Sequence, residues 1–199
     1  MNNMIPDSIL DTLFRKARTH NAWTAEPVSE DELHRLYELM KWGPTSANSS
    51  PARIIFLCSP AAKTRLKPYL SSGNVEKSMA APVTAVIGYD TEFYRHLPRL
   101  FAHSPAMHVL FSEPQNSART ERAAFQNSSL QGAYFILAAR CIGLDCGPMS
   151  GFDAAGVDHE FWAGTSVKTN FLCNLGHGDP SVLFPRLPRL DFEEACRIM

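Results

Sequence analysis

Apolar positions recur with helical spacing between residues 29 and 42. Ser29 precedes this stretch, and Glu32 three residues later completes the spacing of a capping box. Gly43 and Pro44 then end the pattern. The apolar positions at i, i+3, i+4 and i+7 are Leu33, Leu36, Tyr37 and Met40. The stretch therefore predicts an amphipathic helix with one buried face.

Two short apolar runs, residues 54–58 and 83–89, are bounded by Pro or Gly and predict buried strands. Residues 171–176 form a weaker third candidate. Helical pieces are expected at residues 61–70 and 75–81, between the first two strands. Because short strands alternate with helices, the pattern predicts one mixed domain of the α/β or α+β class.

The longest predicted helix, residues 119–142, is apolar on more than one face. One seam along it consists of Ala123, Asn127, Leu130, Tyr134, Leu137 and Cys141. Further apolar bulk lies on the other sides, at Phe125, Phe135 and Ile136. A helix of this kind is buried, either in the middle of a domain or in a subunit interface.

The chain has 199 residues, a formal net charge of −1 and 45% hydrophobic residues. We expect a single domain over residues 1–199, without a linker or repeat. The balanced charge argues against a nucleic-acid partner, and no apolar run is long enough to indicate a membrane partner. The five cysteines include no CxxC pair. Reduced thiols in a cytoplasmic protein are the plain interpretation.

The usual catalytic fingerprints are missing from the sequence. It contains no GxxxxGK[ST] loop, no GxGxxG after a strand and no HExxH. His103 and His108 are five residues apart, a spacing that does not align two metal ligands on one helical face. Ser150 in GPMSG has the wrong order for a nucleophile elbow, and His177 fits a turn histidine better than a general base. We expect no metal site and no catalytic acid or base.

Three separated loops carry donors suited to one large, anionic, ring-bearing ligand. The first, ARTHNAW, follows a predicted N-terminal helix, and its Arg18 offers a planar fork of donors suited to a phosphate. Thr19, His20 and Asn21 add polar groups beside it. Taken alone, this loop fits a solvated helix end better than a phosphate site.

The second loop, GPTSANSSP, places Ser46 and Asn48 before a strand, either to bind a ligand or to cap the strand. In the third, GPMSGFD at residues 147–153, the glycines and proline predict a turn that allows close approach of a flat ligand. The segment FPRLPRL adds Arg186 and Arg189 as phosphate candidates.

These loops together resemble the FMN-dependent nitroreductase superfamily. The similarity is carried, in order, by Arg18-Thr19, the turn PTSANSSP, the turn PMSGFD and Arg186. It implies an α+β, nitroreductase-like fold with a central mixed, mostly antiparallel sheet flanked by helices. It also implies an intertwined homodimer with exchanged terminal segments, in which NADH or NADPH passes hydride to flavin N5 and an acceptor then takes it in a ping-pong cycle.

The resemblance further implies which residues contact the flavin. The backbone N–H groups near Ser150 and Gly151 are expected at N5, and the arginines at the phosphate. The expected FMN contacts are Arg18, Thr19, His20, Asn21, Ser46, Asn48, Pro148, Met149, Ser150, Gly151, Arg186 and Arg189.

Within the family, the stretches FYRHLP, GLDCGPMSGFD and LPRL most resemble the subgroup that reduces malonic semialdehyde in pyrimidine catabolism. The chain differs from the wider family at Asn21, where a second Arg is common, and at Ser150, where some members have Glu. The main task is therefore expected to be reduction of this small aldehyde acid. The alternatives are reduction of nitro compounds or quinones, and flavin binding or storage without turnover.

A carboxylate substrate needs a cation near the flavin. Residues 92–104, EFYRHLPRLFAHS, combine Arg95, Arg99 and His103 with aromatic residues. We interpret this segment as a mobile cover in which Arg95 or Arg99 contacts the acid group. The alternative is a helix whose arginines face solvent.

Overall fold

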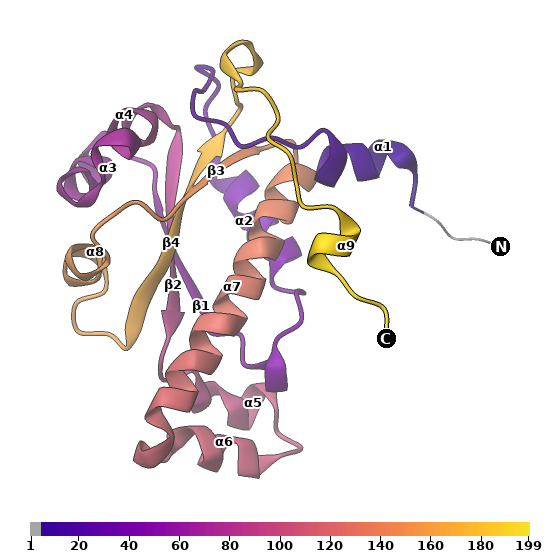
Figure 1. Cartoon of the computed structure of the whole chain (residues 1–199). Coiled ribbons are helices and arrows are strands. Elements are labelled where there is room, and N and C mark those ends of the chain that lie inside the picture. The colour runs from indigo at the N-terminus through magenta and orange to yellow at the C-terminus, as the bar shows by residue number, and fades with distance from the viewer. Residues whose placement is uncertain (1–4) are drawn as a thin grey trace.

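The computed structural model describes residues 5–199 and is built on a four-stranded sheet (Figure 1). Its strand order is β1-β2-β4-β3, and every pairing between these strands is antiparallel. Among the described residues, the one parallel pairing is an isolated bridge between Thr19 and Cys146. The expected α+β, mostly antiparallel architecture is therefore confirmed. The strands are β1 (Ala52–Leu57), β2 (Val83–Asp90), β3 (Asp145–Met149) and β4 (Val167–Gly176).

Helices cover both faces of the sheet, with α2 and α7 on one face and α3, α4 and α8 on the other (Figure 1). The long helices are α2 (Glu30–Met40) and α7 (Ser117–Cys141). The shorter α-helices are α1 (Asp7–Leu10), α3 (Pro60–Leu66), α4 (Ser72–Ala80), α5 (Leu97–Leu100), α6 (Pro105–Ser112), α8 (Ala154–Phe161) and α9 (Phe192–Ala195). The remaining helical turns are η1 (Asp11–Arg15), η2 (Ser46–Asn48), η3 (Lys67–Tyr69), η4 (Phe93–His96), η5 (Pro114–Asn116) and η6 (Pro180–Val182).

Strand β2 divides the core into two layers because its alternate side chains point to opposite faces. Val83, Ala85 and Ile87 pack with α2 and α7, whereas Val86 packs in the layer that includes α3 and α8. All four side chains are at most 1% exposed. Burial on both faces is why the strand lacks a regular alternation of apolar and polar residues, and its buried Thr84 donates a hydrogen bond to the Asn174 side chain at 2.7 Å. Each of the valine and isoleucine side chains contributes about 1.5–3 kcal/mol when it is removed from water.

The predicted helix at residues 29–42 is confirmed with its cap. Ser29 accepts a hydrogen bond from the Glu32 backbone N–H, and the Glu32 carboxylate accepts one from the Ser29 backbone N–H. Leu33, Leu36 and Met40 are buried as the apolar stripe predicted, but Tyr37 is 52% exposed. The Tyr37 end of the apolar stripe is therefore not covered by other residues of the same chain.

Helix α7 begins and ends within two residues of the expected bounds, but its faces differ from the expected seam. Phe135 is fully buried in the core, and Asn127 is 6% exposed beneath the turn that precedes β1. Leu130 and Tyr134 are 52% and 39% exposed. Of the predicted seam, Asn127 thus forms a hydrogen bond within its own chain, whereas Leu130 and Tyr134 remain exposed to solvent.

The interpretation of residues 147–153 as one turn was wrong in its first half. Asp145–Met149 form strand β3, which pairs with β4 through Gly147↔Asn174 and Pro148↔Cys173. Gly and Pro weaken a strand, but a proline is tolerated at a sheet edge, where its missing N–H breaks no ladder. The pairing with β4, which local composition does not encode, decides this element.

Two further features bear on the site. Strand β4 begins at Val167, four residues before the expected start. Residues 183–199 run along the outside of the molecule toward the C-terminus in Figure 1, and their apolar side chains Phe184, Leu187 and Leu190 are about 70% exposed.

Within residues 5–199, no helix combines the length and apolar character needed to cross a membrane.

Candidate functional site

The ARTHNAW loop lies against β3, so two of the predicted loops meet at one edge of the sheet. Thr19 bridges to Cys146, and the His20 backbone N–H donates to the Cys146 carbonyl at 3.0 Å. Gly147 makes this contact possible, since a Cβ there would lie 2.6 Å from the His20 carbonyl oxygen. Strand β3 then leads directly into Ser150. The structure thus brings Arg18 and its neighbours to the strand that runs into the third predicted loop, GPMSGFD.

His20 itself is part of the scaffold. Its side chain is 7% exposed and packs so closely on Gly178 that a Cβ there would lie 2.2 Å from the imidazole. Its Nδ1 lies 3.4 Å from a carboxylate oxygen of Asp145 without forming a hydrogen bond. The other Asp145 oxygen accepts the Gly178 N–H at 2.9 Å. The ring therefore fastens the loop to the segment after β4 and is not presented at the surface.

The loop after β3 is held in place by the start of α4. The carbonyl of Gly151 accepts hydrogen bonds from the Asn74 amide at 2.7 Å and the Ser71 N–H at 3.1 Å. Among residues 5–199, the Gly151 N–H has no partner, which leaves it available as a donor. Met149 is 8% exposed, and its sulfur accepts from Ser78. Of the expected contacts in this loop, Met149 is therefore shielded and Pro148 is partly buried, whereas Ser150 is exposed and the Gly151 backbone offers a free donor.

Arg18 and Arg186 lie at the crossing of the N-terminal loop and the C-terminal segment. Arg18 donates to the Phe184 carbonyl, and Arg186 donates to the Ala17 carbonyl at 2.8 Å. Neither guanidinium forms an ion pair with a carboxylate in the part of the chain that the structure describes. Two cations without an acidic partner, at one place, are the donor set that an anionic group such as a phosphate requires.

Arg189 is not brought to the same place. It donates to the carbonyls of Leu187 and Pro188, at 3.1 and 3.0 Å, within its own segment. Thr19 and Asn21 flank the cationic crossing without a side-chain hydrogen bond among the described residues. Arg18 and Arg186 are thus the phosphate candidates that the fold places together.

Sequence reasoning missed two residues of α4, Asn74 and Lys77. Asn74 orients the Gly151 loop, and the Lys77 carbonyl accepts a hydrogen bond from Trp23 Nε1 at 3.2 Å. Burial lowers the pKa of the Lys77 ammonium, which has no carboxylate partner within residues 5–199. The signal was the motif SSGNVEK, whose Asn and Lys fall one helical turn apart on the same face.

The turn with Ser46 and Asn48 lies elsewhere, at the start of the edge strand β1. The Ser46 N–H donates to the Asn127 side-chain oxygen at 2.7 Å, and the Asn48 amide donates to the Leu100 carbonyl at 3.0 Å. Strands β1 and β3 are the two edges of the sheet. Three strand spacings separate them, about 14 Å. One chain therefore does not bring this turn to the Arg18 and Gly151 loops.

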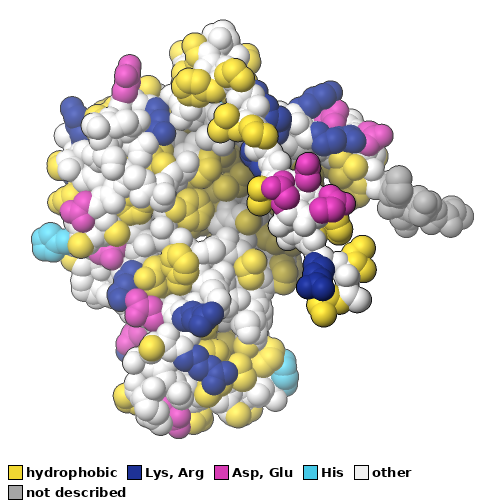
Figure 2. Space-filling model, in the orientation of Figure 1, with side chains coloured by type: hydrophobic (Ala, Val, Ile, Leu, Met, Phe, Trp, Pro, Cys, Tyr) yellow, Lys and Arg dark blue, Asp and Glu magenta, His cyan; other side chains and the backbone are white. Residues whose placement is uncertain are grey.

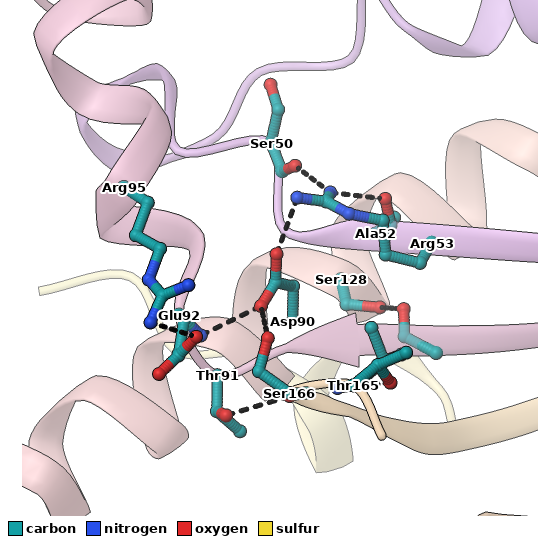
Figure 3. A network of polar contacts seen from close by, with 12 residues as sticks. Ser50, Ala52, Arg53, Asp90, Thr91, Glu92, Arg95, Ser128, Thr165 and Ser166 are labelled. Atoms are coloured by element: carbon teal, nitrogen blue, oxygen red, sulfur yellow. Dashed lines mark hydrogen bonds and ion pairs between the residues drawn. The ribbon is translucent and has the colours of Figure 1, made fainter. Parts of the chain in front are cut away.

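A groove of about 900 Å³ opens beside the Asn48 turn, between α2, β1 and α5. Asn48, Arg53, Arg99 and Leu100 are among its lining residues, whereas Arg95 is not. Arg95 pairs instead with Glu92 at 2.9 Å, as Figure 3 shows. Arg99 forms no ion pair among residues 5–199. Of the two predicted substrate arginines, Arg99 is therefore the free cation in the groove.

The segment at residues 92–104 forms two short helical turns, η4 and α5, anchored in a hydrophobic cluster of its own. Phe93 and Leu97 are each 1% exposed and pack with Phe111. The ring of His103 packs on Phe101, with centroids 4.0 Å apart. The segment therefore carries Arg99 on a buried support, and its expected mobility stays a prediction.

Asp90 joins this segment to the sheet and to the Asn48 turn (Figure 3). Its carboxylate accepts from Arg53 at 2.6 Å, from Ser166 at 2.6 Å and from the Glu92 N–H at 2.8 Å. Arg53 also donates to the Ser50 carbonyl at 3.1 Å. The side chain of Asp90 is 9% exposed, so water competes little with these bonds. The ion pair therefore fixes three chain segments at one end of the groove.

In the described part of the chain, no group of three or more His, Cys, Asp or Glu residues could hold a metal ion. The imidazole of His177 lies 3.5 Å from the Glu26 carboxylate, consistent with a turn histidine.

The structure is thus that of an α+β protein with an antiparallel sheet between helices, in which Arg18 and Arg186 lie near the β3 edge without a carboxylate partner among residues 5–199. The chain belongs to the nitroreductase family, whose model matches residues 14–176. A Burkholderia lata protein, provisionally named NADH dehydrogenase/NAD(P)H nitroreductase, is 60% identical over 194 residues, which cover 98% of each chain. The family expected from the sequence motifs is thus confirmed.

Solved structures agree on the fold. A Bacillus subtilis nitroreductase has a TM-score of 0.87 at 19% identity and covers 98% of this chain and 100% of its own. A nitroreductase from Exiguobacterium sibiricum, solved with FMN, has a TM-score of 0.83 at 16% identity and covers 100% of this chain and 99% of its own. At such identities, these structures establish the fold alone.

Proposed function

We propose that the protein is an FMN-dependent NAD(P)H oxidoreductase that reduces malonic semialdehyde to 3-hydroxypropionate in pyrimidine catabolism. The observation that carries the flavin assignment is that Arg18 and Arg186 cross near the start of the edge strand β3, while the Gly151 backbone follows the end of the same strand. FMN in the Exiguobacterium sibiricum structure and NAD(P)H in the name of the Burkholderia lata relative support the cofactors.

The residues present fit such a cofactor. Arg18 and Arg186 bind its phosphate, with Thr19 and Asn21 beside them, and the free Gly151 N–H donates to the ring. Lys77 lies on α4, the helix whose Asn74 holds the Gly151 loop. It provides positive charge without an acidic partner among the described residues. When bound, FMN supplies the two-electron hydride relay between nicotinamide and acceptor. The chain binds the cofactor, orients the reactants and excludes water from the site. No catalytic acid from the chain is required.

A homodimer completes this site. Ser46 and Asn48 lie at the β1 edge, and the other loops lie at the β3 edge, so one flavin touches both sets when they come from two chains related by a two-fold axis. Apolar side chains left open on α7 and the C-terminal segment suit such an interface, among them Phe125, Leu130 and Phe184. On the face seen in Figure 2, hydrophobic side chains gather in the hollow beside the C-terminal segment.

The acceptor assignment rests on a free cation in the groove. Arg99 lines the groove together with Asn48, so the second chain places a guanidinium next to the proposed flavin edge. A carboxylate there gains a charge-assisted, bidentate partner. A nitroaromatic or quinone gains no such contact. This difference favours an aldehyde acid over the alternative, a general nitroreductase or quinone reductase.

The experiment has two stages. Purified protein is expected to be yellow and to bleach anaerobically when NADH or NADPH is added, and its mass in solution is expected to be that of two chains. Yellow protein that does not bleach would indicate flavin storage, and protein that takes up no FMN would refute the proposal. Steady-state rates with malonic semialdehyde, a nitroaromatic and a quinone, each with both nicotinamides, then identify the acceptor and the reductant.

A further inference from the structure

The turn between α2 and β1 holds an unusually strained backbone. Ala47, Asn48 and Ser50 have φ angles of 52°, 48° and 41°, and none of them is glycine. A left-handed conformation costs an ordinary L residue about 1–2 kcal/mol. Three such residues within four positions persist only if the surrounding structure holds them. The turn is therefore not stable by its own local preferences.

Helix α7 supplies two buried acceptors to the two ends of this turn. The Ser46 N–H donates to the Asn127 side-chain oxygen at 2.7 Å, and the Ala52 N–H donates to the Gln131 side-chain oxygen at 2.9 Å. The two acceptors are 6% and 5% exposed and lie four residues apart on one helix face. Asn127 also donates from its nitrogen to the Ala123 carbonyl at 2.8 Å, which orients its oxygen toward the turn.

We propose that Asn127 and Gln131 are positioning residues that clamp the strained turn in the conformation that meets the flavin. This inference rests on the proposed function, in which Ser46 and Asn48 contact the flavin. Removal of a clamp leaves the Ser46 or Ala52 N–H without its partner and lets the turn relax toward ordinary φ values. The donors of Ser46 and Asn48 then no longer point where the ligand requires them.

The test measures the turn and the flavin separately. Amide hydrogen exchange at Ser46 and Ala52 reports the clamp, and fluorescence titration reports the Kd for FMN. In Asn127→Ala we expect exchange at Ser46 to rise at least about tenfold, and the Kd to rise about tenfold. Asn127→Asp keeps the acceptor oxygen for the Ser46 N–H but loses the donor to the Ala123 carbonyl, so both values are expected to lie between those of wild type and Asn127→Ala.

Thr120→Val is the matched control, since Thr120 is buried on the same helix but bonds to the Phe111 and Asn116 carbonyls. It lowers global stability without selective exchange at the turn. Gln131→Ala, measured at Ala52, decides the question by itself if Asn127→Ala does not fold. Exchange that rises equally in Thr120→Val and in the clamp variants would overturn the clamp. If wild type binds no FMN, the proposed function fails, and the exchange rates still decide the clamp.

Discussion

Arg18 and Arg186 each donate a hydrogen bond to a main-chain carbonyl beside the other, where the N-terminal loop crosses the C-terminal segment. The crossing joins residues 168 positions apart, and neither guanidinium forms an ion pair with an acidic side chain within residues 5–199. A pair of like charges held together is unfavourable by itself. A bound anion would offset this repulsion, which is the role that the proposed phosphate contact gives to the two arginines.

Arg186→Ala is expected to weaken FMN binding about tenfold or more, because it removes one charge-assisted phosphate donor and the tie to Ala17. A fluorescence titration of the apoprotein measures the Kd. Arg189→Ala is the control, since Arg189 bonds only within its own segment among the described residues. Equal losses in the two variants would contradict the assignment of Arg186.

Arg99→Ala is expected to raise the KM for an aldehyde acid at least about tenfold, with little change for an uncharged quinone, because only the acid uses the guanidinium. Arg95→Ala is the matched control: the same charge is removed from the same segment, but outside the groove. A similar KM increase for the quinone, or a larger effect of Arg95→Ala, would count against the proposed acid contact.

Asp90→Ala is expected to lower the free energy of unfolding by about 3 kcal/mol, since it leaves the Arg53 guanidinium half-buried without its partner. Chemical denaturation near neutral pH measures the change. Glu92→Ala removes the exposed pair with Arg95 and is expected to cost less than about 1 kcal/mol. The prediction fails if the two losses are similar.

The capping box of α2 predicts a pH dependence. Hydrogen bonds from the backbone and side chain of Ser29 lower the pKa of Glu32 below its usual value of 4.5. A carboxyl whose pKa is lower in the folded state stabilises the fold above about 4.5, and this stabilisation disappears as the pH falls through the folded-state pKa. Glu32→Gln should therefore be less stable than wild type near neutral pH, with a difference that narrows in acid. A difference in Tm between Glu32→Gln and wild type that stays constant from neutral pH to below pH 4.5 would contradict the prediction.

Gly147→Ala is expected to weaken FMN binding and stability together, because its Cβ would lie 2.6 Å from the His20 carbonyl and push the Arg18 loop off β3. Gly73→Ala is the control in open space on α4, where alanine is expected to stabilise the protein by about 0.5–1 kcal/mol. Thermal unfolding and FMN titration of both variants test the pair. Unchanged FMN affinity in Gly147→Ala would show that the close contact is not needed.

The sequence by itself determined the elements whose signals are local. The period of α2 with its cap, the apolar run of β2 and the length of α7 follow from residue spacing, because burial of one face imposes that spacing. The motifs around Arg18, Asn48 and Gly151 also sufficed to indicate the family, since each keeps its residue types within a few positions.

Only the tertiary structure decided how these parts combine. Strand β3 exists because it pairs with β4, although Gly147 and Pro148 argue against a strand locally. Asn127 looked like part of an apolar seam, but folding places it under a strained turn. Strand pairing and edge position depend on contacts between residues far apart in the chain, which no local pattern encodes. For the same reason, the separation of the Asn48 turn from the Arg18 loop became visible only in the folded sheet.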